Sequence, residues 1–591
     1  MKVEKVLIII SIFFLLFIGF FHKISAITQD LGRHFLLGEI ILKTHSIPLT
    51  NLFSYTYPDF PFINLHWLSE VFFYLIFIIS GFNGLLIIST LIVLVSFYLV
   101  FSKSVKTTPL LSLTIGSVLY LRVLFERTDI RPEIFSFLFL SLFISILYSY
   151  RKKHTRLIFI LPLIELLWVN MHIYFIVGIA VLGLFLIDSI IMKFKRGELM
   201  KFLQQGCLNR SEFRSKKILL ATSAPVVTLI IILILSILAT LINPSGIKGA
   251  LYPFHVFNNY GYQIEENQNI FFLWQYSQKQ TIIYFALSST LLFLSLLFSL
   301  KKVRIIDWML SIFFTILAIT AIRNFPLFVF ATFIPFMRNL SILTDKIALF
   351  NKKIIVIPLF LIILWQITQV LSLKEFGLGV ETGAKPAADF YLKNNLKGPI
   401  FNNFDIGSYL EYRFYPKEKV FVDGRPGEYP VSFFQEVYIP MQLDKNIFEK
   451  TDQKYKFNTI FFSYTDQTPW GTSFVKQIVT NDNWKIIYLD DYVIILAKNN
   501  SENKNLIEKF LTNIDHLKIS NLNNNDFNSL LRLALFFNKT GLMQQEIEIH
   551  QKILSIKPDF CPSLYNLSVY LIKDNNPAGN IWASKYNNQC K

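Results

Sequence analysis

Acidic, basic and imidazole side chains gather in the segments that separate the long apolar runs of this sequence. The first such segment places Asp30 close to Arg33 and His34. A carboxylate in this setting can orient or deprotonate a hydroxyl or amine nucleophile. Arginine binds phosphate oxygens in pairs through its planar guanidinium group. The residue types therefore predict a transfer reaction on a substrate that carries phosphate.

We assign the catalytic role to Asp30, as a base or as the group that orients the acceptor. The segments that follow other apolar runs hold further arginine, histidine and tryptophan side chains, which suit a phosphate and the face of a sugar ring. The expected donor pocket for phosphate and sugar consists of Arg33, His34, His66, Trp67, Glu70, Arg131, Asn170, His172, Arg323 and Asn324.

Several alternatives stay open for these residues. A divalent metal ion on Asp30 and Glu70 is compatible with the sequence but not required by it. His172 can instead cap a helix, and Trp67 can mark a membrane interface, where tryptophan is enriched. The sequence contains no Walker loop, no HExxH motif and no GxSxG motif. A sugar donor therefore has to come from the membrane in an activated form.

The apolar runs that position these residues are long enough to cross a membrane. Of the 591 residues, 53% are hydrophobic and 16% are charged, and the mean hydropathy is +0.46, which excludes an ordinary soluble enzyme. About 20 apolar residues span the hydrocarbon core of a bilayer. Eleven candidate spans lie near 6–22, 83–101, 108–122, 133–150, 157–170, 172–192, 217–242, 280–300, 306–322, 326–343 and 354–371.

The net charge of +17 comes mainly from basic clusters in loops that can all face the cytoplasm, so it indicates orientation and not a nucleic-acid partner. These clusters contain Lys2, Lys5, Lys103, Lys106, Arg151, Lys152, Lys153, Arg156, the loop 193–217, Lys301, Lys302, Arg304, Lys352 and Lys353. They predict a cytoplasmic N-terminus and an extracytoplasmic C-terminal part.

Two short segments bear on this topology. The apolar stretch 67–80 is too short for a comfortable span, and counting it as one would place Lys103 on the wrong side, so we interpret it as a re-entrant or interfacial helix. Residues 1–26 could instead be a cleaved signal peptide, but Ile24 is a poor residue at the third position before the cleavage site.

After residue 371 the hydrophobic runs shorten to the length of strands. We expect a membrane domain over 1–371 with a large first outer loop at 28–82, and an extracytoplasmic α/β domain over 372–500. The expected strands are Val420–Val422, Thr459–Phe462, Trp484–Leu489 and Tyr492–Ala497.

The remaining residues, 501–591, have a helical pattern. Ala534 and Ser568 are 34 residues apart, with Gly541 and Pro558 between them, which resembles a tetratricopeptide helix pair and the start of a second. Fewer than three repeats indicate a packing appendage, and a protein partner on it stays open. The three cysteines have unrelated positions and indicate neither a disulfide framework nor a metal site.

The whole set is similar to the multi-spanning glycosyltransferases of the GT-C fold, which use polyprenyl-phosphate-linked sugars. The shared features are an acidic residue in the first outer loop, interfacial helices before the second span and an outer C-terminal domain. Asp30 matches the position of the catalytic aspartate. The resemblance implies a hexosyl- or pentosyltransferase with a lipid-linked donor and a glycan, lipid or protein acceptor.

More narrowly, the chain resembles a group of bacterial membrane proteins assigned as glycosyltransferases, over roughly residues 28–430. The segments that support this resemblance include "DLGRHFLLGEII", "RPEIFSFLFL", "LLWVNMHIYFIVG" and "DIGSYLEYRFYPKEKVFVDGRPGEY". Tetratricopeptide tails occur in such proteins. The resemblance implies a multi-pass protein of the bacterial plasma membrane.

Residues 402–425 distantly resemble the acceptor-reading region of oligosaccharyltransferase catalytic subunits. Asp405 and Gly407 match that region, whereas its two tryptophans are replaced, which argues against the reading of a peptide sequon. The resemblance places Asp405 and Gly407 on the acceptor side, and we expect Asp423 and Arg425 there too. The alternative interpretation is a strand–turn–strand edge with Asp423 in the turn.

Two other classes of function remain as alternatives. A transporter or flippase of a lipid-linked or anionic substrate would explain charges at membrane depth, but not a large outer domain. A non-catalytic scaffold that works through its helical tail would leave the outer polar residues without a role.

Overall fold

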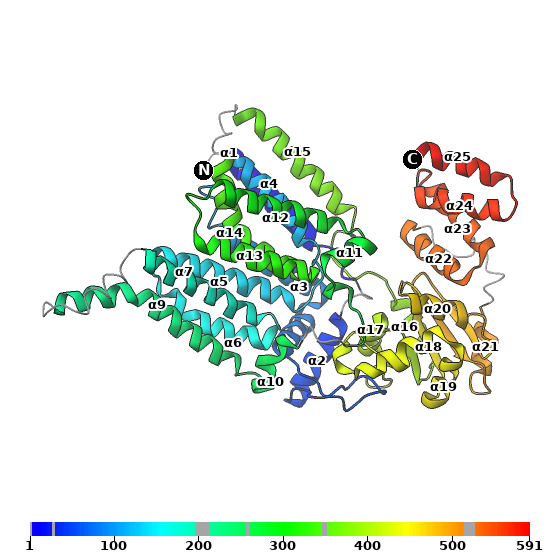
Figure 1. Cartoon of the computed structure of the whole chain (residues 1–591). Helices are drawn as coiled ribbons and strands as arrows, with labels where there is room; N and C mark the ends of the chain where they lie inside the picture. Colours follow the sequence, from blue (N-terminus) through cyan, green and yellow to red (C-terminus); the bar gives the residue numbers. More distant parts are fainter. Residues whose placement is uncertain are drawn as a thin grey trace.

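The computed structural model describes residues 3–25, 30–195, 212–255, 260–344, 352–512 and 526–590, with the backbone alone at 195, 212–224 and 352–354. Figure 1 shows a bundle of long helices, an α/β domain at one end of it and a helical tail that forms the C-terminal part of the chain. The expected cleavage site after Ala26 and the basic residues Arg196, Lys201 and Arg210 of the loop 193–217 lie outside the described residues.

The bundle contains six helices that are long and apolar enough to cross a membrane, among the residues described. They lie in α1 (Val3–Phe20), α3 (Trp67–Phe101), α5 (Glu133–Lys153), α7 (Phe175–Lys195), α12 (Gln280–Phe298) and α14 (Phe325–Thr344), the last preceded by the turn η4 (Ile322–Asn324). Shorter apolar helices lie in α4 (Leu110–Leu124), α9 (Glu212–Thr240), α13 (Ile305–Thr320) and α15 (Lys352–Leu371). The chain is therefore a multi-pass membrane protein.

The number of eleven spans stays a prediction. The expected span at 157–170 consists of a 3-10 turn, η1 (Arg156–Ile160), and the short helix α6 (Leu161–Met171), which has only 11 residues. The expected interfacial helix at 67–80 and the expected span at 83–101 are the two parts of α3. They meet at Gly81, whose φ of 63° is a conformation that glycine adopts at little cost.

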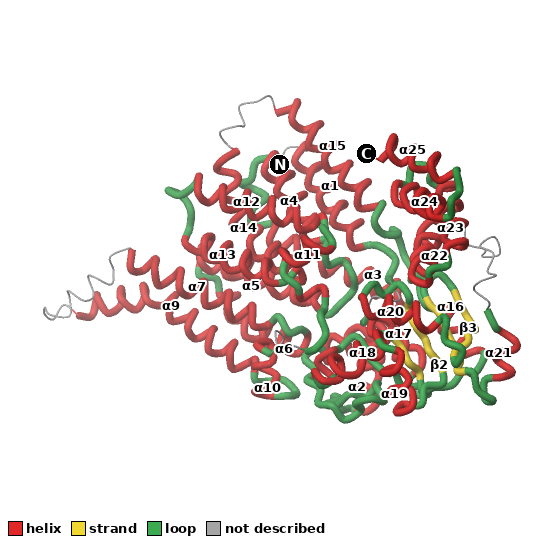
Figure 2. The backbone as a smooth tube through the Cα atoms, turned by 45° about the vertical axis from the view of Figure 1, so that its right-hand side comes forward, coloured by secondary structure: helices red, strands yellow, loops and turns green. Residues whose placement is uncertain are grey.

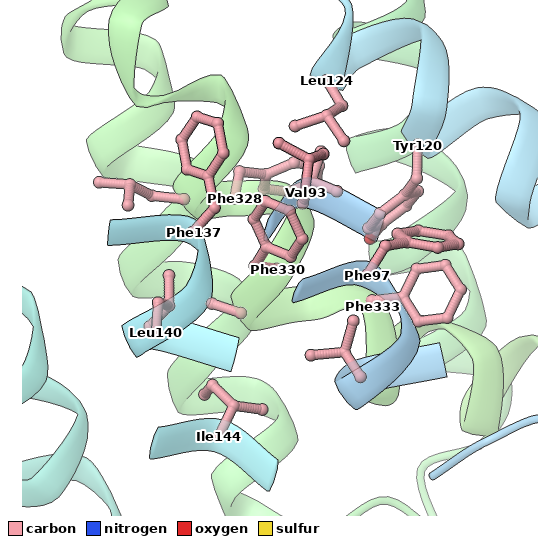
Figure 3. Packing of buried hydrophobic residues seen from close by; sticks show 14 of the residues in the cluster. Val93, Phe97, Tyr120, Leu124, Phe137, Leu140, Ile144, Phe328, Phe330 and Phe333 are labelled. Carbon is pink, nitrogen blue, oxygen red and sulfur yellow. The ribbon is translucent and has the colours of Figure 1, made fainter. Parts of the chain in front are cut away.

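The core of the bundle lies where α3, α4 and α5 pack against α14. Nearly every described side chain of α14 is buried, so this helix is surrounded by the others. Figure 3 shows the aromatic contacts that fill the space between them. Phe97 of α3 and Phe333 have ring centroids 5.1 Å apart, and Phe137 of α5 and Phe330 have centroids 5.4 Å apart. Such edge and offset contacts stabilise a core beyond the area that they bury.

Short helices and turns connect the bundle to the α/β domain. The first connection contains α2 (Leu31–Thr44), which packs along the first part of α3. The connection between α9 and α12 contains α10 (Gly246–Leu251), η2 (Tyr252–Phe254), η3 (Glu265–Asn267) and α11 (Ile270–Tyr276).

The α/β domain is built on a four-stranded sheet with the order β1-β2-β4-β3, visible in yellow in Figure 2. β1 (Ile400–Asn402) is parallel to β2 (Thr459–Ser463), with Phe401 opposite Ile460, and the other pairs are antiparallel. β3 (Trp484–Leu489) and β4 (Val493–Lys498) complete the sheet. The helices around it are α16 (Lys385–Lys393), α17 (Phe404–Phe414), η5 (Pro426–Glu428), η6 (Phe433–Tyr438), α18 (Ile439–Leu443), α19 (Lys445–Tyr455), α20 (Pro469–Ile478) and α21 (Lys504–Phe510).

Three of the four predicted strands correspond to β2, β3 and β4, but the strand–turn–strand alternative for 402–425 is wrong. Its first half is the helix α17, in which residues 406–411 are all buried, without the alternation of a half-buried strand. The expected strand Val420–Val422 is irregular. Val420 forms an isolated parallel bridge with Ser54, and the side chain of Asn402 accepts from Phe421 N (2.9 Å) and donates to Val422 O (2.7 Å).

The tail forms two helix pairs, α22 (Phe527–Thr540) with α23 (Met543–Ile556) and α24 (Cys561–Lys573) with α25 (Ala578–Cys590). Gly541 ends α22 with a φ of 74°, as expected for a helix C-cap. The prediction of no disulfide is wrong, because Cys561 and Cys590 are bonded. Their positions gave no signal in the sequence, since the helix pair brings together residues 29 apart. The assignment as a tetratricopeptide stays a prediction.

Gly38 provides a test of the packing of α2 on α3. A Cβ atom at this position would lie 2.3 Å from the backbone oxygen of Glu70, closer than atoms can approach. Overpacking of this kind costs about 1–3 kcal/mol. We therefore expect Gly38→Ala to lower the thermal unfolding temperature of the protein in detergent. Gly183→Ala is the control, because its Cβ would meet no atom within 4 Å. Equal unfolding temperatures for the two variants would contradict the described packing.

Candidate active site

A cavity of about 330 Å³ lies where the helical bundle meets the α/β domain. Its walls come from the start of α2, the loops before α3 and α5, the turn after α6, the 252–267 connection, η4 and η5. Of the residues selected from the sequence, eight line it: Asp30, Arg33, His34, His66, Arg131, His172, Arg323 and Arg425. The others, Trp67, Glu70, Asn170, Asn324, Asp405, Gly407 and Asp423, are not among its lining residues.

Sequence reasoning missed several polar residues of the cavity. These are Arg127, Glu133, Tyr252, Tyr260, Asn267 and Glu428. The close alternation of acidic and basic residues at 126–133 was a signal for the first two. The tyrosines had none, because an isolated tyrosine in a loop is compatible with many roles.

One acidic residue of the 252–267 connection holds two arginines together. Oε1 of Glu266 lies 2.6 Å from Nη1 of Arg127 and 2.9 Å from Nη1 of Arg131. Arg127 also pairs through Nε with Oε1 of Glu133, at 2.8 Å. Burial alone would raise the pKa of Glu266, but Arg131 and Arg127 outweigh it, and the pKa lies well below its ordinary value. Glu266 is therefore ionised and balances part of the positive charge.

Asp30 lies next to Arg33 at the start of α2. Oδ2 of Asp30 is 3.6 Å from Nη2 of Arg33. Burial raises the pKa of Asp30, but Arg33 and then Arg131 lower it further, so the pKa is below its ordinary value. Arg33 is only 7% exposed, and its Nε has no hydrogen-bond acceptor among the described residues. A buried donor without an acceptor is costly, so this nitrogen suits an anionic ligand.

Three imidazole rings follow one another along the wall. The ring centroids of His34 and His66 are 6.1 Å apart, and those of His66 and His172 are 5.2 Å apart. Burial lowers the pKa of each ring, helped by Arg33 at His34 and by the neighbouring histidine at the other two, and the pKa of His66 falls to about 3. All three rings are therefore neutral at neutral pH.

A chain of hydrogen bonds sets the tautomer of His172. Nε1 of Trp168 donates to Oγ of Ser136 (2.7 Å), and this hydroxyl lies 2.8 Å from Nδ1 of His172. The backbone N–H of Tyr174 also points at Nδ1, at 3.4 Å. Nδ1 is therefore an acceptor, and the single proton of the neutral ring is on Nε2. His172 is a hydrogen-bond donor to the cavity.

Arg323 is held from two sides. Its Nε donates to the hydroxyl of Tyr174 (3.0 Å) and its Nη1 donates to Oδ1 of Asn267 (2.8 Å). The same tyrosine hydroxyl donates to Oδ1 of Asn324 (3.0 Å), so Asn324 supports the site from outside it. Asn170 has a comparable position, because its Oδ1 accepts from Nε1 of Trp67 at 2.7 Å.

The α/β domain contributes Arg425, which lies among three buried carboxylates. Its guanidinium contacts Oδ2 of Asp423 (2.7 Å), Oε2 of Glu428 (2.5 Å) and Oε1 of Glu411 (3.3 Å). The segment comes very close to the membrane domain, since a Cβ atom on Gly424 would lie 3.0 Å from Oδ1 of Asp30. Asp423 thus orients Arg425.

Asp405 and Gly407 occupy the first turns of α17. A Cβ atom on Gly407 would lie 2.2 Å from the backbone oxygen of Val422, so glycine allows α17 to approach the segment that holds Asp423. Gly407 therefore lies behind the wall that the α/β domain contributes, whereas the side chain of Asp405 is exposed and does not line the cavity.

The residues do not fit a metal ion on Asp30 and Glu70. Oε1 of Glu70 lies 3.1 Å from Nδ1 of His34, and Oε2 accepts from Nδ2 of Asn64 at 2.6 Å. Both oxygens are thus occupied, and Asp30 is paired with an arginine. Over the described part of the chain, no three His, Cys, Asp or Glu side chains are grouped as metal ligands would be.

The charge cluster around Arg425 makes a prediction about stability. Removal of one partner from a buried ion cluster leaves uncompensated charge, at a cost of about 3–5 kcal/mol. We expect Arg425→Met to lower the free energy of unfolding by this amount in a denaturant titration. Arg413→Met is the control, since the partner of Arg413 is the half-exposed Asp389, and such pairs contribute at most about 1 kcal/mol. Equal losses in both variants would contradict the role of Arg425.

The sequence matches no described protein family and no curated protein, whereas two solved structures share its fold. The archaeal oligosaccharyltransferase AglB from Archaeoglobus fulgidus, in complex with an inhibitory peptide and a dolichol-phosphate, is similar with a TM-score of 0.54 and 10% identity, over 94% of this chain and 86% of that chain. An Archaeoglobus fulgidus oligosaccharyltransferase in the apo form has a TM-score of 0.52 and 11% identity, over 93% and 85%. The chain therefore has the GT-C-like fold of membrane oligosaccharyltransferases.

Proposed function

We propose that the protein is a membrane glycosyltransferase that moves a sugar from a polyprenyl-phosphate donor to an acceptor on the extracytoplasmic face. The observation that supports this most is the cavity itself, in which Asp30 and five arginines meet where the helical bundle ends. Ionisable residues at membrane depth are costly and usually line a functional cavity.

The arginines are suited to the phosphate of the donor. Arg33 keeps a buried nitrogen without an acceptor, and Arg323 presents a guanidinium that Tyr174 and Asn267 hold in place. A guanidinium stabilises the charge that develops on a departing phosphate more strongly in a buried site than in water. The fixed Nε2–H of His172 adds a neutral donor to the same surface.

The acceptor enters next to Asp30, in this proposal. The wall closest to Asp30 comes from the α/β domain, through Gly424 and Arg425. A carboxylate that remains ionised beside Arg33 is suited to orient an acceptor hydroxyl or amine by accepting a hydrogen bond from it. In the proposal the buried Asp423 supports this wall from behind, and the exposed Asp405 belongs to the acceptor side.

The neighbour AglB was solved with a dolichol-phosphate and an inhibitory peptide, and this supports a lipid-phosphate donor for the present chain. The transferred group is a hexose or a pentose, and the acceptor is a glycan, a lipid or a protein. The transport alternative does not explain why the α/β domain completes the cavity wall.

The orientation that we propose has the N-terminus in the cytoplasm and the α/β domain outside the plasma membrane of a bacterium. Disulfides persist in oxidising compartments, so the bond between Cys561 and Cys590 in the tail favours this orientation. The tail lies on the same side and could recruit a protein partner through a tetratricopeptide-like surface.

Orientation can be tested with a membrane-impermeant maleimide on intact cells. If the tail is extracytoplasmic, Cys561 and Cys590 stay unlabelled until a reductant is added outside, and are labelled afterwards without permeabilisation. Labelling that requires permeabilisation would place the tail in the cytoplasm. The experiment uses a Cys207→Ser background, because Cys207 lies in a loop predicted to be cytoplasmic. A Cys561→Ser variant in that background is the control, because its single remaining thiol at 590 is labelled from outside without reductant.

The activity can be tested with purified protein and a radiolabelled polyprenyl-phosphate sugar. We expect release of the lipid phosphate, and a loss of roughly 10²-fold or more in Asp30→Asn, because orientation and proton transfer contribute at least this much. Asp389→Asn is the matched control, since Asp389 is half-exposed on α16. Full turnover by Asp30→Asn would remove Asp30 from the chemistry. Passage of the substrate into liposomes without release of phosphate would favour a transporter.

A further inference from the structure

We propose that His34, backed by Glu70, accepts the proton of the acceptor nucleophile, while Asp30 orients that nucleophile. This assignment rests on the proposed function and adds the identity of the base. It starts from a carboxylate and an imidazole that the fold holds together although they are 36 residues apart. Such a pair is a recurrent device of enzymes that activate hydroxyl nucleophiles.

Glu70 is fixed before any substrate binds. The residue is fully buried, and its Oε2 accepts a hydrogen bond from Nδ2 of Asn64 at 2.6 Å. Oδ1 of Asn64 in turn accepts from the backbone N–H of His66 at 2.9 Å, so the amide cannot turn away. The remaining oxygen, Oε1, lies 3.1 Å from Nδ1 of His34. Glu70 therefore has one oxygen committed to its support and one committed to the imidazole.

Burial raises the pKa of Glu70, whereas the hydrogen bond from Asn64 and the charge of Arg33 lower it. In the proposal Glu70 is ionised. An ionised carboxylate only accepts hydrogen bonds, so in the proposal Nδ1 of His34 donates and the lone pair of the neutral ring is on Nε2. His34 lines the cavity and Glu70 does not. Since Nδ1 is turned to Glu70, Nε2 is the nitrogen that a substrate can reach. His34 thus presents a proton acceptor.

His172 shows the opposite arrangement in the same cavity. Its Nδ1 receives hydrogen bonds from Ser136 and Tyr174, so its Nε2 holds a proton and cannot accept another one. The two histidines are therefore distinguishable by their partners alone. His172 can donate to a phosphate or a sugar hydroxyl, and His34 can accept from a nucleophile.

Asp30 is less suited to be the base. Its Oδ2 already pairs with Nη2 of Arg33, at 3.6 Å, so one of its two oxygens is committed to an ion pair. It is nevertheless in the right place to orient, because its backbone oxygen accepts from the N–H of His34 at 3.1 Å, one helical turn away. A nucleophile bound to the carboxylate of Asp30 then lies beside His34.

Burial and then Arg33 also lower the pKa of His34, which keeps the free imidazole neutral and ready to accept. A phosphate bound at the arginines offsets the positive charge of Arg33, and so raises the basicity of His34 when the donor is present. Binding of the donor phosphate thus makes His34 a stronger base.

In the proposed reaction, the nucleophile oxygen or nitrogen forms a bond to the anomeric carbon, and its proton passes to Nε2 of His34. The bond between the anomeric carbon and the phosphate oxygen breaks, and its electron pair leaves with the lipid phosphate. Glu70 stays ionised and stabilises the imidazolium, which later returns its proton to water.

The test is a pH–rate series with saturating lipid-phosphate sugar. We expect the rate of the wild type to rise with pH along a limb that reports His34. His34→Gln should lose roughly 10²-fold in kcat and flatten this limb, with the KM for the donor unchanged within about twofold. Glu70→Gln should lower the rate and shift the pH range over which the rate rises, because an amide can donate to Nδ1 and reverse the tautomer of His34. Asp30→Asn should be slow but keep the limb.

The control is His255→Gln, an exposed histidine outside the cavity, which should behave like the wild type. Unfolding temperatures show that each variant is folded, and partial restoration of His34→Ala by added imidazole would be a sign of proton transfer that a structural role cannot give. If the wild type is active and His34→Gln keeps both the wild-type rate and the rise of the rate with pH, the role of His34 is overturned and the proposed function is not. A wild type that releases no lipid phosphate overturns the proposed function, and the role of His34 with it.

Discussion

Positive charge at the end of an apolar helical bundle is the constraint on which the rest of this structure depends. Five arginines line one cavity where the helical bundle meets the α/β domain, and an uncompensated buried cation is costly. Glu133 at the start of α5, Glu266 in the 252–267 connection and Asp423 in the α/β domain supply the compensating carboxylates. Because these carboxylates come from three parts of the chain, the positive charge is balanced only when the three parts come together and assemble the site.

The α/β domain is therefore part of the site and not an appendage. Arg425 and Glu428 lie on the wall opposite the helix ends, and close packing at Gly407 and Gly424 brings that wall to Asp30. The hydrogen bonds behind the wall, from Arg425 to Asp423 and from Tyr429 to Asp423, are short and buried. Such supports reduce the reorganisation that a transfer reaction would otherwise require.

A large part of the candidate site could be predicted from sequence, because a charge at the end of an apolar run has few structural reasons to be there. Asp30 and Arg323 are examples. Which residue faces the cavity and which supports it could not be predicted, since neighbouring positions on a helix point about 100° apart and the rotation of the helix is set by packing. Glu70 and Asn170 were thus grouped with the lining residues although they lie behind them.

The sequence alone determined that the chain crosses a membrane several times, where three of the four strands lie and which segments between the apolar runs hold polar residues. These features depend on the period of hydrophobic residues over a few neighbouring positions. Only the tertiary structure decided that 404–414 is a helix packed on the Asp423 segment, that Cys561 meets Cys590, that Glu70 contacts Nδ1 of His34, and that Nδ1 accepts in His172. The physical reason is that a tautomer, a disulfide or a buried ion pair is set by partners that lie tens to hundreds of residues away, which no local pattern records.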